Sequence, residues 1–257
     1  MSALDSIIAG VREDLDQRRI PMGQLLERLE QAPNVRSCLP NLLTDEISII
    51  SEIKRSSPSK GSLAEIVDPA GLAAQYQQAG ASVISVLTER RRFGGSLADL
   101  DSARKAVDIP ILRKDFMISE YQFYEARAHG ADVVLLIVAA LSQNQLDDYF
   151  QLSKELGMKA LVEVHTHDEL ERAIEISPEI IGVNSRNLKT LEVDTQAFSE
   201  LIPKIPTGIA RVAESGISKR EDVLFAQECG ATAILVGEAL VRAQSPSVAI
   251  NQLLGRL

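Results

Sequence analysis

Charged side chains stand at the ends of several apolar segments in this chain of 257 residues. The first segment reads "ISIISEIKR" and carries Glu52 and Lys54, which lie two residues apart and so share one face of an extended strand. A buried ion pair is costly to desolvate, and apolar residues of similar size often serve stability equally well. The two residues are therefore expected to have a chemical role, with a structural ion pair as the alternative.

Other apolar segments end in the same way, in "ILRKDF", "LVEVH", "GVNSRN" and "VAESG". The polar residues that end them are Lys114, Glu163, Asn184, Arg186 and Ser215. Glu163 lies between Val162 and Val164, so it is the hardest of the set to explain as a solvated residue. Lysines, glutamates and hydrogen-bonding groups gathered in this way indicate acid–base chemistry on an anionic small molecule.

Neighbouring polar residues are assigned structural roles. We expect His165 and His167 to support a loop or cap a helix, because two histidines alone are a weak signal for a metal site. No metal is expected. Asp115 and Glu214 are interpreted as ion-pair partners at the rim of the sheet, and Lys60 as a solvated loop residue.

Two glycine-containing turns are suited to a phosphate group. Gly216 lies in "SGI", and Gly237 precedes Glu238 in "GEAL". Each turn leads into a helical pattern, whose first backbone N–H groups are free and whose dipole favours an anion. We expect the backbone amide of Glu238 to contribute, with its side chain turned away.

The elements that position these residues repeat along the chain. Segments such as "QQAGASVISVL" and "QECGATAILVG" end a helical pattern at a glycine and continue as a short apolar run, which is typical of a strand buried on both faces. Strands are predicted at 47–54, 82–87, 109–114, 132–138, 159–164, 180–184, 209–214 and 232–237. Eight strands alternating with helices predict an α/β fold, a (β/α)8 TIM barrel with its site at the carboxyl ends of the strands. A doubly wound sheet is the alternative, but no GxGxxG turn follows the first strand.

The barrel is predicted to be one domain over residues 1–257, with residues 1–45 as an N-terminal helical extension. The formal net charge of -9 argues against a nucleic acid or an anionic membrane as partner. The longest apolar run has nine residues, too few to cross a membrane. Two distant cysteines and an N-terminus without a cationic region favour a cytoplasmic protein with neither a disulfide framework nor a signal peptide.

Seven of these motifs together resemble the indole-3-glycerol phosphate synthase family of tryptophan biosynthesis. They are "SEIKRSSPSKG", "ILRKDF", "LLIVAAL", "LVEVH", "GVNSRNL", "VAESGI" and "LVGEAL". The resemblance implies a (β/α)8 barrel that needs no cofactor. It also implies the conversion of 1-(2-carboxyphenylamino)-1-deoxyribulose 5-phosphate to indole-3-glycerol phosphate, carbon dioxide and water.

The resemblance also implies roles for individual residues. Lys114 is similar to the general acid of ring closure, and Glu163 to a carboxylate that stabilises cationic character or takes a proton. Lys54, oriented by Glu52, is similar to the partner of the substrate carboxylate. The remaining residues that resemble catalytic or substrate-binding positions are Asn184, Ser215, Ser57, Arg186, Phe93, Phe116 and Leu135, the last three as the pocket for the anthranilate ring.

Three other interpretations remain open. Another phosphate-binding barrel, such as a ribulose-phosphate epimerase, would keep the two glycine turns but would not need both strand-end lysines together with Glu163. A Schiff-base aldolase would use a lysine such as Lys114, and a non-catalytic sugar-phosphate sensor would need no acid–base groups.

The expected partner is a phosphorylated small molecule, and the expected state is a monomer, with a weak homodimer as the alternative.

Overall fold

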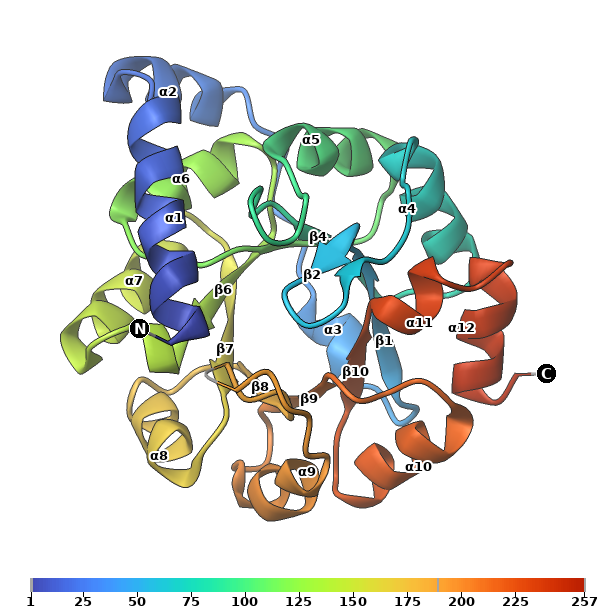
Figure 1. Ribbon diagram of the computed structural model, residues 1–257. Coiled ribbons are helices and arrows are strands. Elements are labelled where there is room, and N and C mark those ends of the chain that lie inside the picture. The colour runs from blue at the N-terminus through green and yellow to red at the C-terminus, as the bar shows by residue number, and fades with distance from the viewer. Residues whose placement is uncertain (1, 189, 257) are drawn as a thin grey trace.

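The computed structural model describes residues 2–188 and 190–256. Eight parallel strands close into a barrel in the order β1-β10-β9-β8-β7-β6-β5-β4 (Figure 1). The strands are β1 (Ser48–Ile53), β4 (Val83–Leu87), β5 (Ile111–Lys114), β6 (Val133–Ile137), β7 (Lys159–Val164), β8 (Ile180–Asn184), β9 (Ala210–Glu214) and β10 (Ala233–Val236). Each lies within two residues of its predicted range, so the predicted (β/α)8 barrel is confirmed.

Helices alternate with the strands and surround the barrel (Figure 1). They are α4 (Pro69–Gln78), α5 (Leu97–Ala106), α6 (Glu120–Ala128), α7 (Gln143–Glu155), α8 (His167–Glu175), α9 (Gln196–Leu201), α10 (Arg220–Glu228), α11 (Glu238–Val241) and α12 (Pro246–Leu254). Side chains at several N-caps accept a hydrogen bond from the first turn, as Asp68 does for α4 and Thr166 for α8. These caps satisfy backbone donors that a helix cannot satisfy internally.

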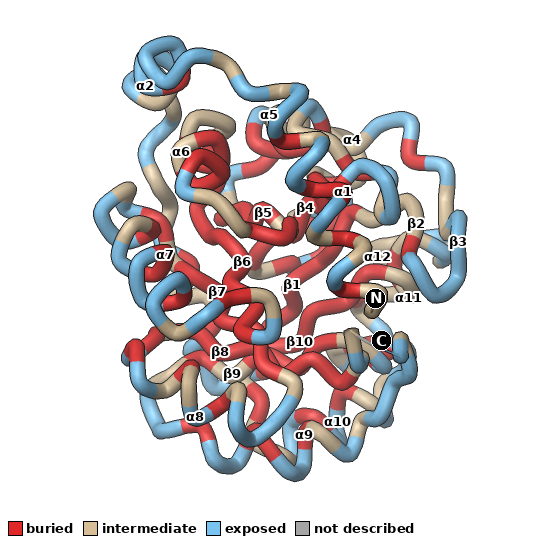
Figure 2. Tube along the Cα trace, turned by 60° about the vertical axis from the view of Figure 1, so that its left-hand side comes forward, coloured by how far each residue is buried: buried red, intermediate tan, exposed pale blue. Residues whose placement is uncertain are grey.

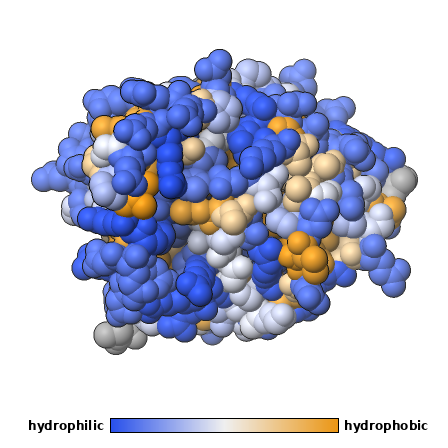
Figure 3. All heavy atoms as spheres, turned by 90° about the horizontal axis from the view of Figure 1, so that it is seen from above, coloured by the Kyte–Doolittle hydropathy of each residue, from blue (hydrophilic) through white to orange (hydrophobic). Residues whose placement is uncertain are grey.

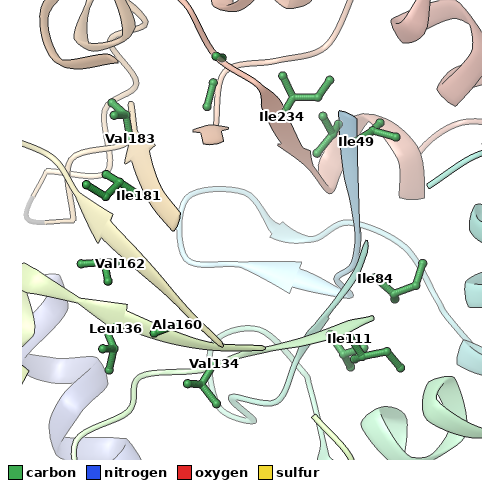
Figure 4. Packing of buried hydrophobic residues seen from close by; sticks show 14 of the residues in the cluster. Ile49, Ile84, Ile111, Val134, Leu136, Ala160, Val162, Ile181, Val183 and Ile234 are labelled. Carbon is green, nitrogen blue, oxygen red and sulfur yellow. The ribbon is translucent and has the colours of Figure 1, made fainter. Parts of the chain in front are cut away.

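Alternate residues of each strand face two different cores. Ile49 and Ile53 belong to the larger cluster between the strands and the helices, whereas Ile50 and Leu112 belong to the cluster inside the barrel. Figure 4 shows the outward-facing side chains, Ile49 among them, around the ring of strands. The strands are buried along almost their whole length (Figure 2). Because the period is two, a polar residue at an inward position points into the barrel.

The N-terminal extension reaches both ends of the barrel. Helix α1 (Ala3–Arg18) packs Leu4 and Ile7 into the same apolar cluster as Phe116, which follows β5. After α2 (Met22–Glu30), the short helix α3 (Leu39–Leu42) lies at the opposite end, where Asn41 is hydrogen-bonded to Ser48 and Ser82, beside the first residues of β1 and β4. The extension is therefore helical, as predicted for residues 1–45, and α3 is the shortest of its three helices.

The segment after β1 forms a two-stranded hairpin, β2 (Ser56–Ser57) and β3 (Gly61–Ser62), which the predicted strands did not include. Arg55 fixes its base through Asp99 and the carbonyl of Ile66.

The surface in Figure 3 is predominantly hydrophilic with small apolar patches. Within the described residues, no helix is both long and apolar enough to cross a membrane.

Candidate active site

Four charged side chains from alternate strands meet at the carboxyl end of the barrel. Counted around the ring, they come from the first, third, fifth and seventh strands: Glu52 on β1, Lys114 on β5, Glu163 on β7 and Glu214 on β9. Alternate strands of a TIM barrel contribute the side chains of one interior layer. The position of these four residues in the barrel therefore places them side by side.

Lys114 is the cation of this layer. Its Nζ donates to Glu163 Oε2 at 2.9 Å and lies 3.2 Å from Glu214 Oε2. Its neighbour Arg113 points to the other side of the strand, where it is fully buried and paired with Asp115 and Glu125. Asp115 is therefore a rim partner as predicted, whereas Glu214 lies inside the cluster.

The charges of Lys114 and Glu163 stabilise each other. Burial, the largest effect on Lys114, lowers its pKa, but Glu163, Glu214 and Glu52 outweigh burial and the pKa is raised. Burial would raise the pKa of Glu163, but Lys114 and the nearby His165 hold it well below its usual range. At neutral pH the pair is an ammonium and a carboxylate.

Glu214 is the site residue that sequence reasoning missed. Burial, with Glu163 as the nearby like charge, raises the pKa of Glu214 to about 8, against the effect of Lys114. Its Oε1 is buried and has no hydrogen-bond partner among the described residues. A Cβ added at Gly182 on β8 would lie 2.1 Å from this oxygen, so the carboxyl group packs directly over that glycine. Its position could have identified it, because Glu214 ends the seventh strand and the other three charged residues lie at or next to the ends of the first, third and fifth.

Glu52 and Lys54 lie side by side at the end of β1. Lys54 Nζ is 3.5 Å from Glu52 Oε1 and 5.5 Å from the centre of the Phe93 ring. The backbone of Gly237, after β10, passes so close that a Cβ there would lie 2.5 Å from Glu52 Oε1. Gly237 therefore makes room for the Glu52 carboxylate as well as forming a turn.

An apolar pocket opens beside these charges. The rings of Phe93 and Phe116 are tilted against each other with centroids 6.1 Å apart, and Leu135 lines the same space. Ile137 and Leu188 complete the apolar wall, although the sequence did not single them out. Lys54, Lys114, Glu163 and Glu214 line the pocket too, so a flat apolar ring placed there would lie against the charged layer.

A second, larger pocket of about 520 Å³ adjoins the first. Its lining includes the predicted Ser215, Gly216, Gly237 and Glu238. Ser215 and Gly216 both have positive φ, 67° and 73°, so the chain turns sharply after β9. The Glu238 side chain accepts from Lys60 Nζ at 2.8 Å. Lys60 is therefore an exposed loop residue, as predicted, at the rim of this pocket.

Asn184 and Arg186 connect the two pockets. Asn184 Oδ1 accepts the backbone N–H of Arg186 at 3.0 Å, and the Arg186 guanidinium donates to Ser59 in the loop after β1 and to the carbonyl of Leu191. Ser57 is the one predicted residue that lines neither pocket, because its side chain is buried in the hairpin and has no partner among the described residues.

The arrangement can bind an anion at one end and an apolar ring at the other, with proton donors and acceptors between them. Across residues 2–188 and 190–256, no three histidine, cysteine or carboxylate side chains are grouped so as to hold a metal ion.

Comparisons with known proteins agree with this arrangement. A family model described as indole-3-glycerol phosphate synthase matches residues 4–253. The chain is 54% identical over 255 residues to indole-3-glycerol phosphate synthase 1 of Streptomyces coelicolor, covering 98% of this chain and 95% of that protein. It is also 54% identical over 259 residues to indole-3-glycerol phosphate synthase of Paenarthrobacter aurescens, with the same two coverages of 98% and 95%. A crystal structure of a 3-hexulose-6-phosphate synthase superimposes with a TM-score of 0.65 at 17% identity, covering 82% of this chain and 100% of that one, which is a likeness of fold alone.

Proposed function

The chain belongs to the indole-3-glycerol phosphate synthase family, and from that premise we propose that its barrel mouth performs the ring closure of tryptophan biosynthesis. The substrate is 1-(2-carboxyphenylamino)-1-deoxyribulose 5-phosphate, and the products are indole-3-glycerol phosphate, carbon dioxide and water. The reaction makes the chain a carboxy-lyase.

The observation that carries the proposal is the way the two pockets join. They share Glu52, Lys54, Arg186, Ser215 and Leu235 in their linings. The substrate has an apolar ring with a carboxylate at one end and a phosphate at the other. An apolar pocket and a glycine-walled pocket that meet at Lys54 and Arg186 match this distribution of groups.

We place the ring between Phe93 and Phe116, with Leu135 against its edge. Lys54 lies close to the Phe93 ring and is the cation available to the substrate carboxylate. The phosphate is assigned to the backbone N–H groups around Gly216, Gly237 and Glu238, with Arg186 as a neighbouring cation.

Ring closure forms a bond between the ring carbon that carries the carboxylate and the ketone carbon of the sugar. Lys114 donates a proton to the ketone oxygen, so its N–H bond breaks and an O–H bond forms on the substrate. Positive charge then develops on the ring system, and Glu163 stabilises it. Loss of carbon dioxide restores the aromatic ring. The new hydroxyl group then leaves as water by taking a proton from an acid, a role that suits Lys54. The adjacent CH2 carbon gives up a proton to a carboxylate of the charged layer, which forms the double bond of the indole.

The charge state of Lys114 separates this function from a Schiff-base aldolase. A nucleophilic lysine must be neutral, and such lysines have a depressed pKa. The carboxylates around Lys114 raise its pKa, which suits an acid and hinders a nucleophile.

We also propose that the enzyme is a cytoplasmic monomer. Cys38 and Cys229 are free thiols, as a reducing compartment would keep them. A weak homodimer is the alternative, which the sedimentation of the purified protein would reveal.

The function is tested by mixing the purified protein with the carboxyphenylamino-deoxyribulose phosphate carrying ¹³C in its carboxylate. We expect indole fluorescence to rise together with an equal amount of labelled carbon dioxide. Consumption of the substrate without either product would contradict the assignment.

A further inference from the structure

A largely buried histidine lies between two carboxylates behind the charged layer. His165 follows β7, and its Nδ1 is 3.0 Å from Glu169 Oε2 on α8. Its Nε2 is 3.4 Å from Glu163 Oε1. The backbone N–H of His165 donates to the same Glu169 oxygen at 2.8 Å, so backbone and ring are fixed by one carboxylate.

The two oxygens of Glu163 therefore face different cations. Oε2 accepts from Lys114 on the side of the pocket, and Oε1 faces His165 on the side away from it. His165 lines neither of the two pockets, so it does not meet the substrate directly. Its position between Glu163 and Glu169 points to an effect exerted through Glu163.

Lys114 loses its positive charge when it gives up a proton. Glu163 is 1% exposed, and the other residue paired with Lys114, Glu214, is an acid that cannot replace the lost charge. A buried carboxylate without a cation is costly, so Glu163 would tend to take the proton itself. When Lys114 has become neutral, His165 is the cation that remains beside Glu163.

We propose that His165 is a positioning residue for the reaction: its imidazolium holds Glu163 by Oε1 and keeps that carboxylate charged while Lys114 transfers its proton. The proton transfer from Lys114 is part of the proposed function, so this role of His165 rests on it. The positive charge of His165 does not depend on that function. Nε2 is buried and makes no aligned hydrogen bond within the described part of the chain, so its N–H is available to Glu163 when Lys114 withdraws.

The charges around His165 support an imidazolium. Glu163 faces it from β7 and Glu169 from α8, and Lys114 and Glu214 lie beyond Glu163. Burial lowers the pKa of His165, but the two adjacent carboxylates outweigh burial and raise it to about 9. The ring is therefore charged at neutral pH and loses its proton as the pH rises through about 9.

A purely structural role is the competing explanation. Glu169 lies in the first turn of α8, so His165 could serve only to anchor the start of that helix. His167 provides the matched control, because it starts the same helix but its ring is exposed and meets only Lys204 in the described structure. Replacing His167 perturbs the helix start without touching Glu163.

The first experiment measures the charge directly. The chain has three histidines, so the imidazole Cε1–H signals can be assigned by removing His129 and His167 in turn. We expect the signal of His165 to titrate near pH 9 in the wild type and at lower pH in Glu163→Gln and Glu169→Gln, each of which removes one negative charge. Titration near the ordinary histidine pKa of about 6.5, or a value unchanged in Glu163→Gln, would overturn the proposal.

The second experiment separates positioning from folding. His165→Gln keeps a side-chain N–H donor but not the charge. We therefore expect kcat to fall about 10- to 100-fold, the scale seen when the hydrogen-bond partner of a metal-binding residue is lost, with KM changed less than about twofold. His167→Gln should keep wild-type kcat. An unchanged kcat in His165→Gln, or a loss matched by His167→Gln, would overturn the proposal. A wild-type protein that forms no indole product would contradict the proposed function instead, because the titration of His165 is judged separately.

Discussion

Lys114 and Glu163 form a buried ion pair across the barrel, although their strands β5 and β7 are separated by β6. The two side chains meet because alternate strands of the barrel contribute to one interior layer. The same layer contains Glu52 and Glu214, so one lysine is surrounded by three glutamates. This excess of acid keeps Lys114 protonated until a substrate reaches it.

The carboxylate of Glu163 is expected to be essential for turnover. Glu163→Gln keeps the shape of the side chain but removes its charge and its basicity, so kcat should fall by at least about a hundredfold, the usual scale for an acid–base group. Turnover is followed by indole fluorescence and folding by a circular-dichroism melt. Near-normal turnover in a normally folded variant would return Glu163 to a structural role.

Glu214 makes stability depend on pH in a defined direction. Its pKa in the folded state is raised to about 8, above the ordinary value of a glutamate, so the stability that it contributes is present at low pH and is lost as the pH rises toward 8. Glu214→Gln resembles the protonated form at every pH. Relative to the wild type, this variant should therefore gain stability steadily between about pH 4.5 and pH 8 in urea titrations. A constant difference over that interval would show that Glu214 titrates normally.

The two glycines of the larger pocket are expected to behave differently when replaced by alanine. Gly216 has φ of 73°, and a Cβ there would lie 2.7 Å from Thr195. Gly216→Ala should therefore disturb the turn that we propose binds the phosphate, and raise KM more than it lowers kcat. In Gly237→Ala the new Cβ would lie 2.5 Å from Glu52 Oε1, so kcat should fall as well.

Steady-state kinetics and the affinity for inorganic phosphate distinguish the two effects. Gly23→Ala is the control, because the added Cβ would meet no atom within 4 Å beyond its chain neighbours and the backbone of its own helix. Phosphate affinity equal to that of the wild type in Gly216→Ala would remove this turn from the phosphate site.

The barrel and much of its site could be predicted because strand periodicity fixes which side chains point inward. The inward position of Glu163 followed from its neighbours Val162 and Val164, which belong to the outer core. Glu214 has an outer-core neighbour on one side only, Ala213, because Ser215 on the other side is polar. A rim ion pair therefore explained Glu214 equally well until the strands were placed around the ring.

Other features depend on contacts that the sequence does not encode locally. The burial of His165 is produced by Glu169 folding back from α8 onto the end of β7. The hairpin of β2 and β3 has only two residues in each strand, too few for an alternating pattern, and it is held by Arg55. Strand propensity over two residues carries little information, so this segment could not be distinguished from a loop.

The most direct test of the central claim, that Lys114 supplies the proton for ring closure, compares the wild type with Lys114→Met. Substrate binding is measured by calorimetry, product by indole fluorescence, and covalent chemistry by mass spectrometry after borohydride is added during turnover. We expect the variant to bind the substrate and form no indole product, and we expect the wild type to carry no adduct on Lys114. Product formation by the variant at a rate near that of the wild type, or a borohydride-trapped adduct on Lys114, would contradict the account.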